Sequence, residues 1–188
     1  MKQPQKNMTR YVNQLIKNNW GMILVLLSIM TIRSSFADWY TVPSGSMLPT
    51  IEIGDRVTVN KMAYDFRLPF TDTVLANLSD PERGDIVIIA SQAADERLVK
   101  RVIGLPGDTV AMQDEQLVIN SQPLRYQVIK DSAQALYLNE QLGALWHQIR
   151  VDKTRDSAYG NLATVTIPPN HYLVMGDNRR NSADSRVY

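Results

Sequence analysis

The chain has 188 residues, with 20 Lys or Arg against 19 Asp or Glu, so its formal net charge is +1. This balance argues against nucleic acid or a strongly anionic molecule as a partner. The absence of cysteine excludes disulfides, thiolate metal ligands and a cysteine nucleophile, but it does not choose a compartment. The two histidines, His147 and His171, stand in no metal-ligand spacing and in no nucleophile motif. We therefore expect both to be structural, and we expect no metal and no cofactor.

An apolar segment near the N-terminus is the first predicted element. From Asn18 to Ala37 the only charged residue is Arg33. About 20 helical residues at ~1.5 Å each cover the ~30 Å core of a bilayer. The residues before this segment include Lys and Arg but no acidic residue, which by the positive-inside rule keeps the N-terminus in the cytoplasm. We expect residues 1–37 to be a cytoplasmic N-terminus with a single transmembrane helix, and residues 38–188 to lie outside.

A cleaved signal peptide is the alternative for the same segment. Ser35-Phe36-Ala37 has the small-x-small pattern of a cleavage site. Arg33 lies between the apolar core and that site, which is unusual for cleavage. The uncleaved anchor is therefore the favoured interpretation.

Beyond Asp38 the chain has the pattern of many short β-strands separated by turn residues such as Gly54-Asp55 and Gly84-Asp85. The expected strands are 56–59, 86–89, 98–103, 117–119, 164–167 and 171–175. This spacing predicts an all-β barrel or sandwich-like domain. Residues 132–149 are rich in Ala, Leu, Gln and Glu, which favours a partly helical segment. Together with the hairpin before it, this segment is expected to form a smaller insertion at about 111–165.

The run PSGSMLPT at 43–50 places Ser46 on a tight turn just beyond the apolar segment. Gly45 lets the backbone approach closely, and Pro43 and Pro49 stiffen both flanks. A catalytic serine needs an exposed hydroxyl and nearby N–H donors for an oxyanion. An isolated Ser-Gly-Ser is typical of an ordinary polar turn, whereas the whole run after an apolar segment favours a nucleophile.

Lys100 lies in the predicted strand 98–103. Strand alternation places it beside Leu98 and Val102, while Arg101 points to the other face. Desolvation there disfavours the ammonium form. To act as a base near neutral pH, the amine must fall roughly three units from a pKa of ~10.4, which is about 4 kcal/mol. The alternative is a surface lysine whose stem covers apolar neighbours. The presence of Ser46 favours Lys100 as a general base, because a serine and a neutral amine can hydrolyse a peptide bond without histidine.

A third motif, GDNRRNSADSR, occupies residues 176–186. Its acidic and basic residues alternate, which favours ion pairs that brace a loop. Ser182 offers a hydroxyl that can hold a lysine amine in place. Composition alone is also typical of a solvated polar loop.

These motifs, together with RGDIVII (83–89) and KRVIGLPGD (100–108), resemble bacterial signal peptidase I, the leader peptidase, from about Ile32 to the end of the chain. The resemblance implies a mainly β, mostly antiparallel catalytic domain on the outer face of the bacterial cytoplasmic (inner) membrane. It also implies a serine endopeptidase that cuts signal peptides from exported preproteins after a small-x-small (Ala-x-Ala) motif. The implied partners are these preproteins and the lipid bilayer.

The resemblance further assigns roles to the residues that match the family's motifs. Ser46 is the nucleophile and Lys100 the general base. Ser44 adds its hydroxyl to the Ser46 N–H in the oxyanion hole, and Ser182 orients Lys100. The other matches are structural ion pairs (Arg101 with Asp177, Asp184 with Arg186), a glycine that keeps space clear behind the lysine (Gly176), and walls of small-residue pockets (Val42, Met47, Val99).

The chain departs from the longer members of that family in three ways. It has one anchor, a compact insertion, and an end at Tyr188 where family members usually continue into a closing strand. Losing that strand exposes a sheet edge and loosens the Ser182 loop. A catalytically impaired or truncated copy, which binds exported chains at the membrane without cutting them, therefore remains open. A Ser–Lys self-cleaving regulator needs a DNA-binding helical module at the N-terminus, where this chain has an apolar segment.

Overall fold

The computed structural model describes residues 4–35, 37–68, 71, 73–91, 96–155 and 160–187. The chain divides into two compact units. The first contains residues 1–39 and 58–80, and the second contains residues 40–57 and 81–188. The Ser46 turn (43–50), the Lys100 strand and the 176–186 loop all belong to the second unit.

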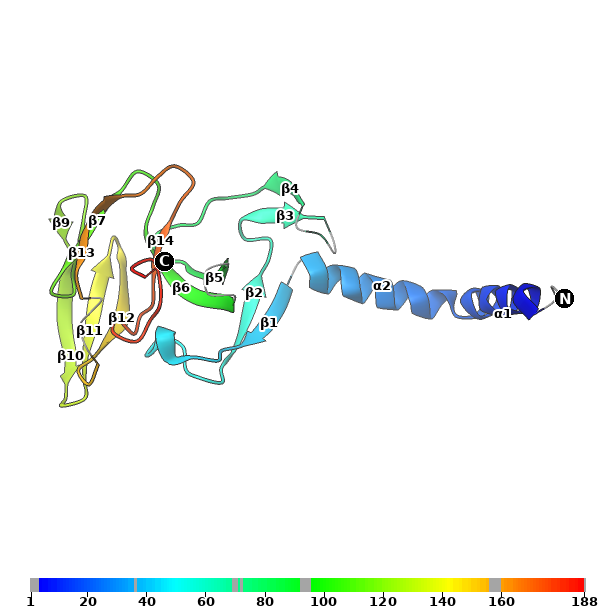
Figure 1. Ribbon diagram of the computed structural model, residues 1–188, viewed down its shortest axis with the longest axis horizontal. Helices are drawn as coiled ribbons and strands as arrows, with labels where there is room; N and C mark the ends of the chain where they lie inside the picture. The colour runs from blue at the N-terminus through cyan, green and yellow to red at the C-terminus, as the bar shows by residue number, and fades with distance from the viewer. Residues whose placement is uncertain are drawn as a thin grey trace. The chain divides into compact units, whose positions relative to one another are not determined.

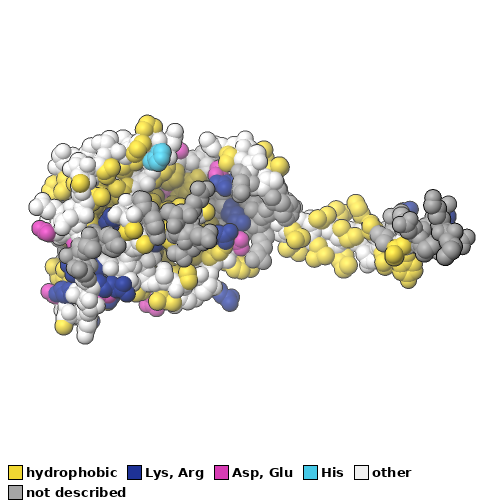
Figure 2. Space-filling view, in the orientation of Figure 1, with side chains coloured by type: hydrophobic (Ala, Val, Ile, Leu, Met, Phe, Trp, Pro, Cys, Tyr) yellow, Lys and Arg dark blue, Asp and Glu magenta, His cyan; other side chains and the backbone are white. Residues whose placement is uncertain are grey.

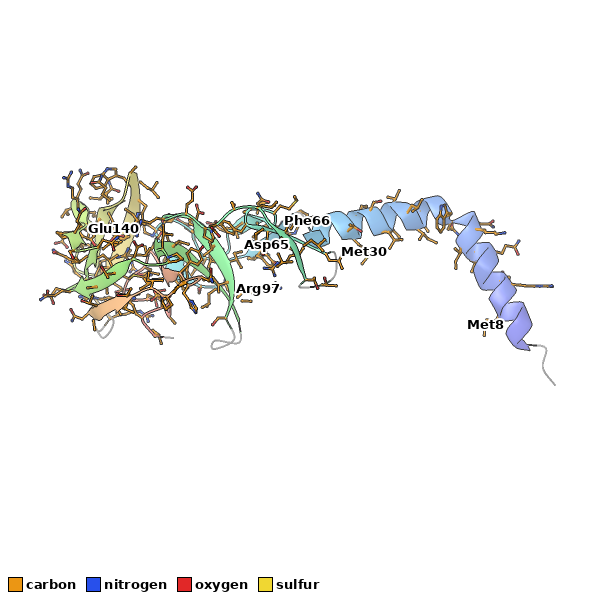
Figure 3. The ribbon with its side chains drawn as sticks, turned by 90° about the horizontal axis from the view of Figure 1, so that it is seen from above. Met8, Met30, Asp65, Phe66, Arg97 and Glu140 are labelled. Atoms are coloured by element: carbon orange, nitrogen blue, oxygen red, sulfur yellow. The ribbon has the colours of Figure 1, made fainter. Side chains whose placement is uncertain are left out.

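Helix α2 (Trp20–Ser35) occupies the region of the predicted span, and helix α1 (Pro4–Asn18) precedes it. They are separated at Asn19, whose side-chain amide donates to the Leu15 carbonyl at 2.9 Å. Figure 3 shows the two helices meeting at an angle, with Met8 on α1 and Met30 on α2. Among the described residues, no helix combines the length and the apolar character that crossing a membrane requires. Phe36, in the alternative cleavage site, and Tyr188 lie outside the described residues.

Helix α2 exposes large apolar side chains on every side. Leu24, Val25, Leu26 and Leu27 are consecutive, and each is about half exposed. Four consecutive positions cover a whole turn of helix, and Figure 2 shows hydrophobic side chains along its length. The hydroxyls of Ser28 and Thr31 donate to the carbonyls four residues earlier, so the helix satisfies these polar groups within itself.

The first unit also contains the antiparallel hairpin of β3 (Asp65–Arg67) and β4 (Val74–Asn77). Asp65 and Phe66 lie on its first strand (Figure 3). Two further strands, β1 (Ala37–Thr41) and β2 (Arg56–Asn60), pair with each other. The β3–β4 hairpin is closed by the Leu78 N–H, which donates to the Tyr64 carbonyl at 2.8 Å.

Three antiparallel sheets build the second unit (Figure 1). One has the order β14-β6-β5, with β6 in the centre: β5 is Ile86–Ser91, β6 Glu96–Gly104 and β14 Leu173–Met175. The second has the order β13-β7-β8-β9, formed by Leu162–Thr166, Thr109–Gln113, Gln116–Ile119 and Gln122–Pro123. The third contains β10 (Arg125–Asp131), β11 (Ala135–Leu142) and β12 (Leu145–Asp152). The prediction of a mainly β, antiparallel fold is confirmed.

Two apolar clusters form the interior of the second unit. The larger draws on all three sheets: Ile103, Val110, Met112, Leu117, Ile119, Leu142, Ile167, Leu173 and Met175. The smaller surrounds the Ser46 turn and consists of Val42, Met47 and Ile51, packed against Val57 and Val99. The first cluster holds the sheets together, and the second fixes the turn that carries Ser46.

The predicted helical character of residues 132–149 is wrong. This segment is the β11–β12 hairpin, in register from Ala135 opposite Asp152 to Leu142 opposite Leu145. In β12, buried His147, Ile149 and Val151 alternate with more exposed neighbours, which is the period of two of a strand. Gly143, with a φ of +65°, supplies the tight turn. Pairing across this turn outweighs the helix propensity of the Ala-, Leu- and Glu-rich composition.

Candidate active site

The Ser46 turn is a single turn of 3₁₀ helix over Gly45–Met47, entered from Ser44 in an extended conformation. The Leu48 N–H donates to the Gly45 carbonyl at 3.3 Å, and the Ile51 N–H donates to the Met47 carbonyl at 3.0 Å. Met47 is completely buried in the smaller apolar cluster. The buried Met47 side chain therefore anchors the turn, and Ser46 is the residue directly before it.

Lys100 reaches Ser46 from the central strand β6. Its Nζ lies 3.0 Å from Ser46 Oγ and 3.1 Å from the Val99 carbonyl oxygen. Lys100 is 2% exposed and Ser46 8%. Ser44 Oγ lies 3.5 Å from Ser46 Oγ. The structure thus brings Ser44, Ser46 and Lys100 together, as the sequence motifs predicted, although Ser46 and Lys100 are 54 positions apart.

Gly176 makes a close approach to the turn possible. A Cβ at this position would lie 2.4 Å from the Ser46 carbonyl oxygen and 2.4 Å from Ser182 Oγ. Real Cβ atoms do not approach other atoms that closely, so only glycine fits here. Ser182 is buried beside it, and its Oγ makes no hydrogen bond of ordinary geometry among the described residues, although its hydroxyl helps to lower the pKa of the nearby Asp184 carboxyl. The role of Ser182 in orienting Lys100 stays a prediction.

Arg101, the neighbour of Lys100 on β6, binds Asp177 through a buried fork. Its Nε donates to Asp177 Oδ1 at 2.9 Å, and its Nη2 donates to Oδ2 at 2.7 Å. Its Nη1 donates to the Gly84 carbonyl at 2.8 Å. Thr50, at the end of the Ser46 turn, also donates to Asp177 Oδ2. The carboxylate therefore ties β6 and the turn to the start of the 176–186 loop.

A second fork closes the other end of this loop. Arg186 Nε and Nη2 donate to the two oxygens of Asp184 at 2.8 and 2.7 Å. The Gly176 N–H also donates to Asp184 Oδ2, at 3.0 Å. Burial raises the pKa of the Asp184 carboxyl, but the hydrogen bonds and charge of Arg186 outweigh burial and hold this pKa below its usual value. The loop is thus closed on itself with Ser182 between the two ends.

Comparison with known protein families identifies the family to which this chain belongs. Residues 15–188 match the model of one family, described as signal peptidase, peptidase S26. The chain belongs to this signal peptidase family. The resemblance seen in the sequence is therefore confirmed at the level of the family.

Curated relatives give the extent of the similarity. Signal peptidase I of Pseudomonas aeruginosa is 38% identical over 180 residues, which cover 93% of this chain and 63% of the relative. Signal peptidase I T of Bacillus subtilis is 33% identical over 169 residues, covering 89% of this chain and 74% of the relative. The crystal structure of a signal peptidase I from Enterococcus faecalis is 30% identical and covers 58% of this chain and 87% of that chain, with a TM-score of 0.37. The chain thus spans less than two thirds of the length of the Pseudomonas relative.

In this signal peptidase family member, the predicted pocket walls lie around the Ser46 turn. Val42 and Met47 are buried in the smaller apolar cluster, and Val99 packs against it from β6. A separate cavity of about 530 Å³ is lined by residues such as Arg83, Asn120 and Gln141, and it contains neither Ser46 nor Lys100. The candidate site is therefore the turn, where Ser46 and Lys100 meet, and not this cavity.

Sequence patterns missed a buried ion pair next to the 176–186 loop. Arg179 Nη1 and Nη2 donate to the two oxygens of Glu140 at 2.9 and 2.5 Å, and both side chains are almost completely buried. Glu140 lies on β11 (Figure 3), and His147 Nε2 on β12 lies 3.3 Å from its Oε1. Burial raises the pKa of the Glu140 carboxyl, but the Arg179 charge outweighs burial and lowers it to about 2. The partners are 39 residues apart, on β11 and on the 176–186 loop, so the packing of this loop against the β11–β12 hairpin brings them together.

Proposed function

We propose that this chain is a membrane-bound serine endopeptidase that removes signal peptides from exported preproteins, cutting after a small-x-small (Ala-x-Ala) motif. The observation that carries the proposal is the 3.0 Å separation of Ser46 Oγ and Lys100 Nζ in a buried setting. Membership of the signal peptidase family supports the choice of substrate. The printed names of the Pseudomonas and Bacillus relatives agree with it.

The proposed reaction begins when Ser46 Oγ attacks the carbonyl carbon of the scissile peptide and Lys100 Nζ, as a neutral amine, takes the hydroxyl proton. The negative charge on the carbonyl oxygen is stabilised by the Ser46 N–H and the Ser44 hydroxyl. The Lys100 ammonium then returns its proton to the leaving nitrogen as the C–N bond breaks, leaving an ester on Ser46. Water, losing a proton to Lys100, attacks this ester; as the bond to Ser46 Oγ breaks, the Lys100 ammonium returns that proton to Oγ, which restores both the serine and the neutral amine.

Burial supports the role of Lys100 as a base. With only 2% of the residue exposed, the ammonium form loses nearly all of its hydration. Desolvation of this kind favours the neutral amine, which is the form that can accept the serine proton. The fork between Arg101 and Asp177 places a guanidinium one residue away, but that charge is neutralised by two hydrogen bonds to its own carboxylate.

The substrate is proposed to bind as an extended strand beside residues 42–44 and β6. The apolar side chains of Val42, Met47 and Val99 belong to one cluster at the turn, and they are proposed to form the walls of small-residue pockets. Such walls support a preference for small residues near the cut bond.

Attachment to the bacterial cytoplasmic membrane is proposed through α2. Its large side chains are apolar and exposed on every side, and a helix of that kind is typical of contact with lipid or with a protein core. Lys2, Lys6, Arg10 and Lys17 precede it without an acidic residue, which supports a cytoplasmic N-terminus and a second unit on the outer side.

The test is cleavage of a preprotein with an Ala-x-Ala site by the full chain in phospholipid vesicles, beside Ser46→Ala. We expect the wild type to release the signal peptide and Ser46→Ala to release none. Ser132→Ala is the matched control, because Ser132 Oγ only bonds the Ala135 backbone within its own turn. Cleavage by Ser46→Ala would contradict the assigned nucleophile. A wild type that binds the preprotein without cutting it would instead favour the non-cleaving binding module.

A further inference from the structure

Asn178 makes three hydrogen bonds that the proposed reaction does not use. It is completely buried in the 176–186 loop. Its main-chain N–H donates to the Ser46 carbonyl at 3.0 Å, and its Nδ2 donates to the Gly45 carbonyl at 2.9 Å. Its Oδ1 accepts from Arg150 Nη1 at 3.3 Å. We propose that Asn178 is a positioning residue that aims the Ser46 N–H into the oxyanion hole; this inference rests on the proposed function.

The geometry of one peptide unit carries the proposal. The Gly45 carbonyl and the Ser46 N–H belong to the same planar group, and in a trans peptide they point in opposite directions. A donor that holds the Gly45 oxygen therefore also sets the direction of the Ser46 N–H. The bond from the Asn178 N–H to the Ser46 carbonyl fixes the following peptide unit in the same way. Asn178 thus holds the peptide planes on both sides of the Ser46 Cα.

The amide of Asn178 is itself held in one orientation. An arginine side chain can only donate hydrogen bonds, and a backbone carbonyl can only accept them. Oδ1 must therefore face Arg150 and Nδ2 must face the Gly45 carbonyl, because the flipped amide would place donor against donor and acceptor against acceptor. Arg150 is in turn held by Asp152, with 3.1 Å between Nη2 and Oδ2.

Strand β12 also holds the backbone of Asn178. The Arg150 N–H donates to the Asp177 carbonyl at 2.9 Å, and the Arg179 N–H donates to the Arg150 carbonyl at 2.8 Å. These two bonds form a parallel bridge between Arg150 and Asn178. The β11–β12 hairpin therefore supports the Ser46 turn through Asn178. The next residue of the loop, Arg179, forms the buried fork with Glu140.

A purely structural role for the side chain is the competing explanation. Buried carbonyls require a donor, and the Asn178 amide supplies one to Gly45. The Leu48 N–H, however, already donates to the same oxygen at 3.3 Å. The Asn178 bond is shorter and comes from outside the turn. What it adds is a fixed direction for the peptide relative to β12.

The test is Asn178→Asp in the full chain. This change keeps the shape and the acceptor that faces Arg150, and it removes the donor that holds the Gly45 carbonyl. Losing an oxyanion-hole donor outright costs about 10²–10³-fold in kcat, and misdirecting one is expected to cost about 10–10²-fold. KM for the preprotein should stay within about twofold, because ground-state binding does not use the oxyanion contact. Binding of a peptide boronic acid, whose adduct with Ser46 is tetrahedral, should weaken in parallel with kcat.

Asn161→Asp is the matched control. Its Oδ1 accepts from the Asp114 N–H, so this variant also keeps an acceptor and gains a charge, at an exposed position that bonds the turn between β7 and β8. It should retain the wild-type kcat. Arg150→Met is the second variant and decides the matter if Asn178→Asp does not fold. It frees the Asn178 amide to flip, and kcat should fall a few-fold with KM unchanged.

Three results would overturn the inference. One is an unchanged kcat in both variants. Another is a loss of kcat that only mirrors a smaller folded fraction, measured by thermal unfolding. The third is a fall in kcat with an unchanged affinity for the boronic acid, which would place Asn178 outside the oxyanion hole. Failure of the proposed function is distinct from all three, because then the wild type itself shows no cleavage that depends on Ser46.

Discussion

Among the buried polar pairs of the second unit, Glu140 with Arg179 and Ser46 with Lys100 differ in what each partner can do with a proton. The carboxylate and guanidinium share two hydrogen bonds, and the pKa of Glu140 falls to about 2. Neither group can change its protonation near neutral pH. The hydroxyl and the amine, 3.0 Å apart, can exchange a proton. We therefore propose that burial yields a fixed support in the first pair and a proton-transferring pair in the second, depending on the partner.

Replacing Lys100 with methionine should have the largest effect: it should abolish most of the activity and leave the stability unchanged. Without the amine, no group is placed to take the Ser46 proton, and kcat should fall by at least about 10³-fold. Stability should be kept, because an apolar side chain of similar size replaces a buried polar one. Steady-state kinetics and thermal unfolding measure the two effects. Lys130→Met, at an exposed position on β10, is the matched control, and comparable activity in the two variants would contradict the assignment.

Gly176→Ala should damage the reactive pair through geometry alone. The added Cβ would meet the Ser46 carbonyl and Ser182 Oγ, both 2.4 Å away. A displacement of about 1 Å in a catalytic group costs on the order of 10²-fold in rate. Gly107→Ala is the control, since Gly107 has a φ of +86° but no atom within 4 Å of the added Cβ. It should lose some stability and keep its rate; equal rates in both variants would show that the contact at Gly176 is unimportant.

Glu140→Gln should act on the fixed pair and hence on stability. It leaves the Arg179 charge buried with a weaker partner, which costs roughly 3–5 kcal/mol of unfolding free energy. Denaturant unfolding measures this loss. Adding Arg179→Met to a Glu140→Leu chain removes both charges and should recover most of the stability. If the double variant is as unstable as Glu140→Gln, the ion pair is not the cause.

The same carboxylate predicts an acid limb in the stability of the wild type. The pKa of Glu140 is lowered to about 2 from an ordinary value of 4.5, so its contribution is present above pH 4.5. It is lost as the pH falls from there through about 2, because protons then bind the unfolded chain more tightly than the folded one. Denaturant midpoints across this range should fall more steeply for the wild type than for Glu140→Gln. Parallel curves would mean that other carboxylates set the acid limb.

Local patterns predicted the elements that depend on nearby residues. The Gly- and Pro-bounded turn at Ser46 and the alternation around Lys100 involve a few neighbouring positions, and both are present. In the central strand β6, Lys100 and Val102 on one face and Arg101 and Ile103 on the other are all buried, so both faces of this stretch are covered. Alternation alone assigned apolar surroundings to one face only.

The remaining features depend on contacts between distant parts of the chain. Asn178 is 133 residues from Gly45, and its hydrogen bond follows from how the 176–186 loop meets the turn. The β11–β12 hairpin was mistaken for partial helix because its composition favours helix, whereas cross-strand pairing decides its structure. The helix α1 before the apolar segment, which ends at Asn18, was also not predicted.

The pH dependence of kcat/KM for preprotein cleavage tests the central claim, that a neutral Lys100 amine is the base for Ser46, most directly. The profile reports the ionisations of the free enzyme. We predict a limb that rises with a slope of about one as a single group loses its proton, with a midpoint below the ~10.4 of an ordinary lysine. A profile that stays flat from about pH 5 to 10 would contradict the claim, because no titrating base would then be needed.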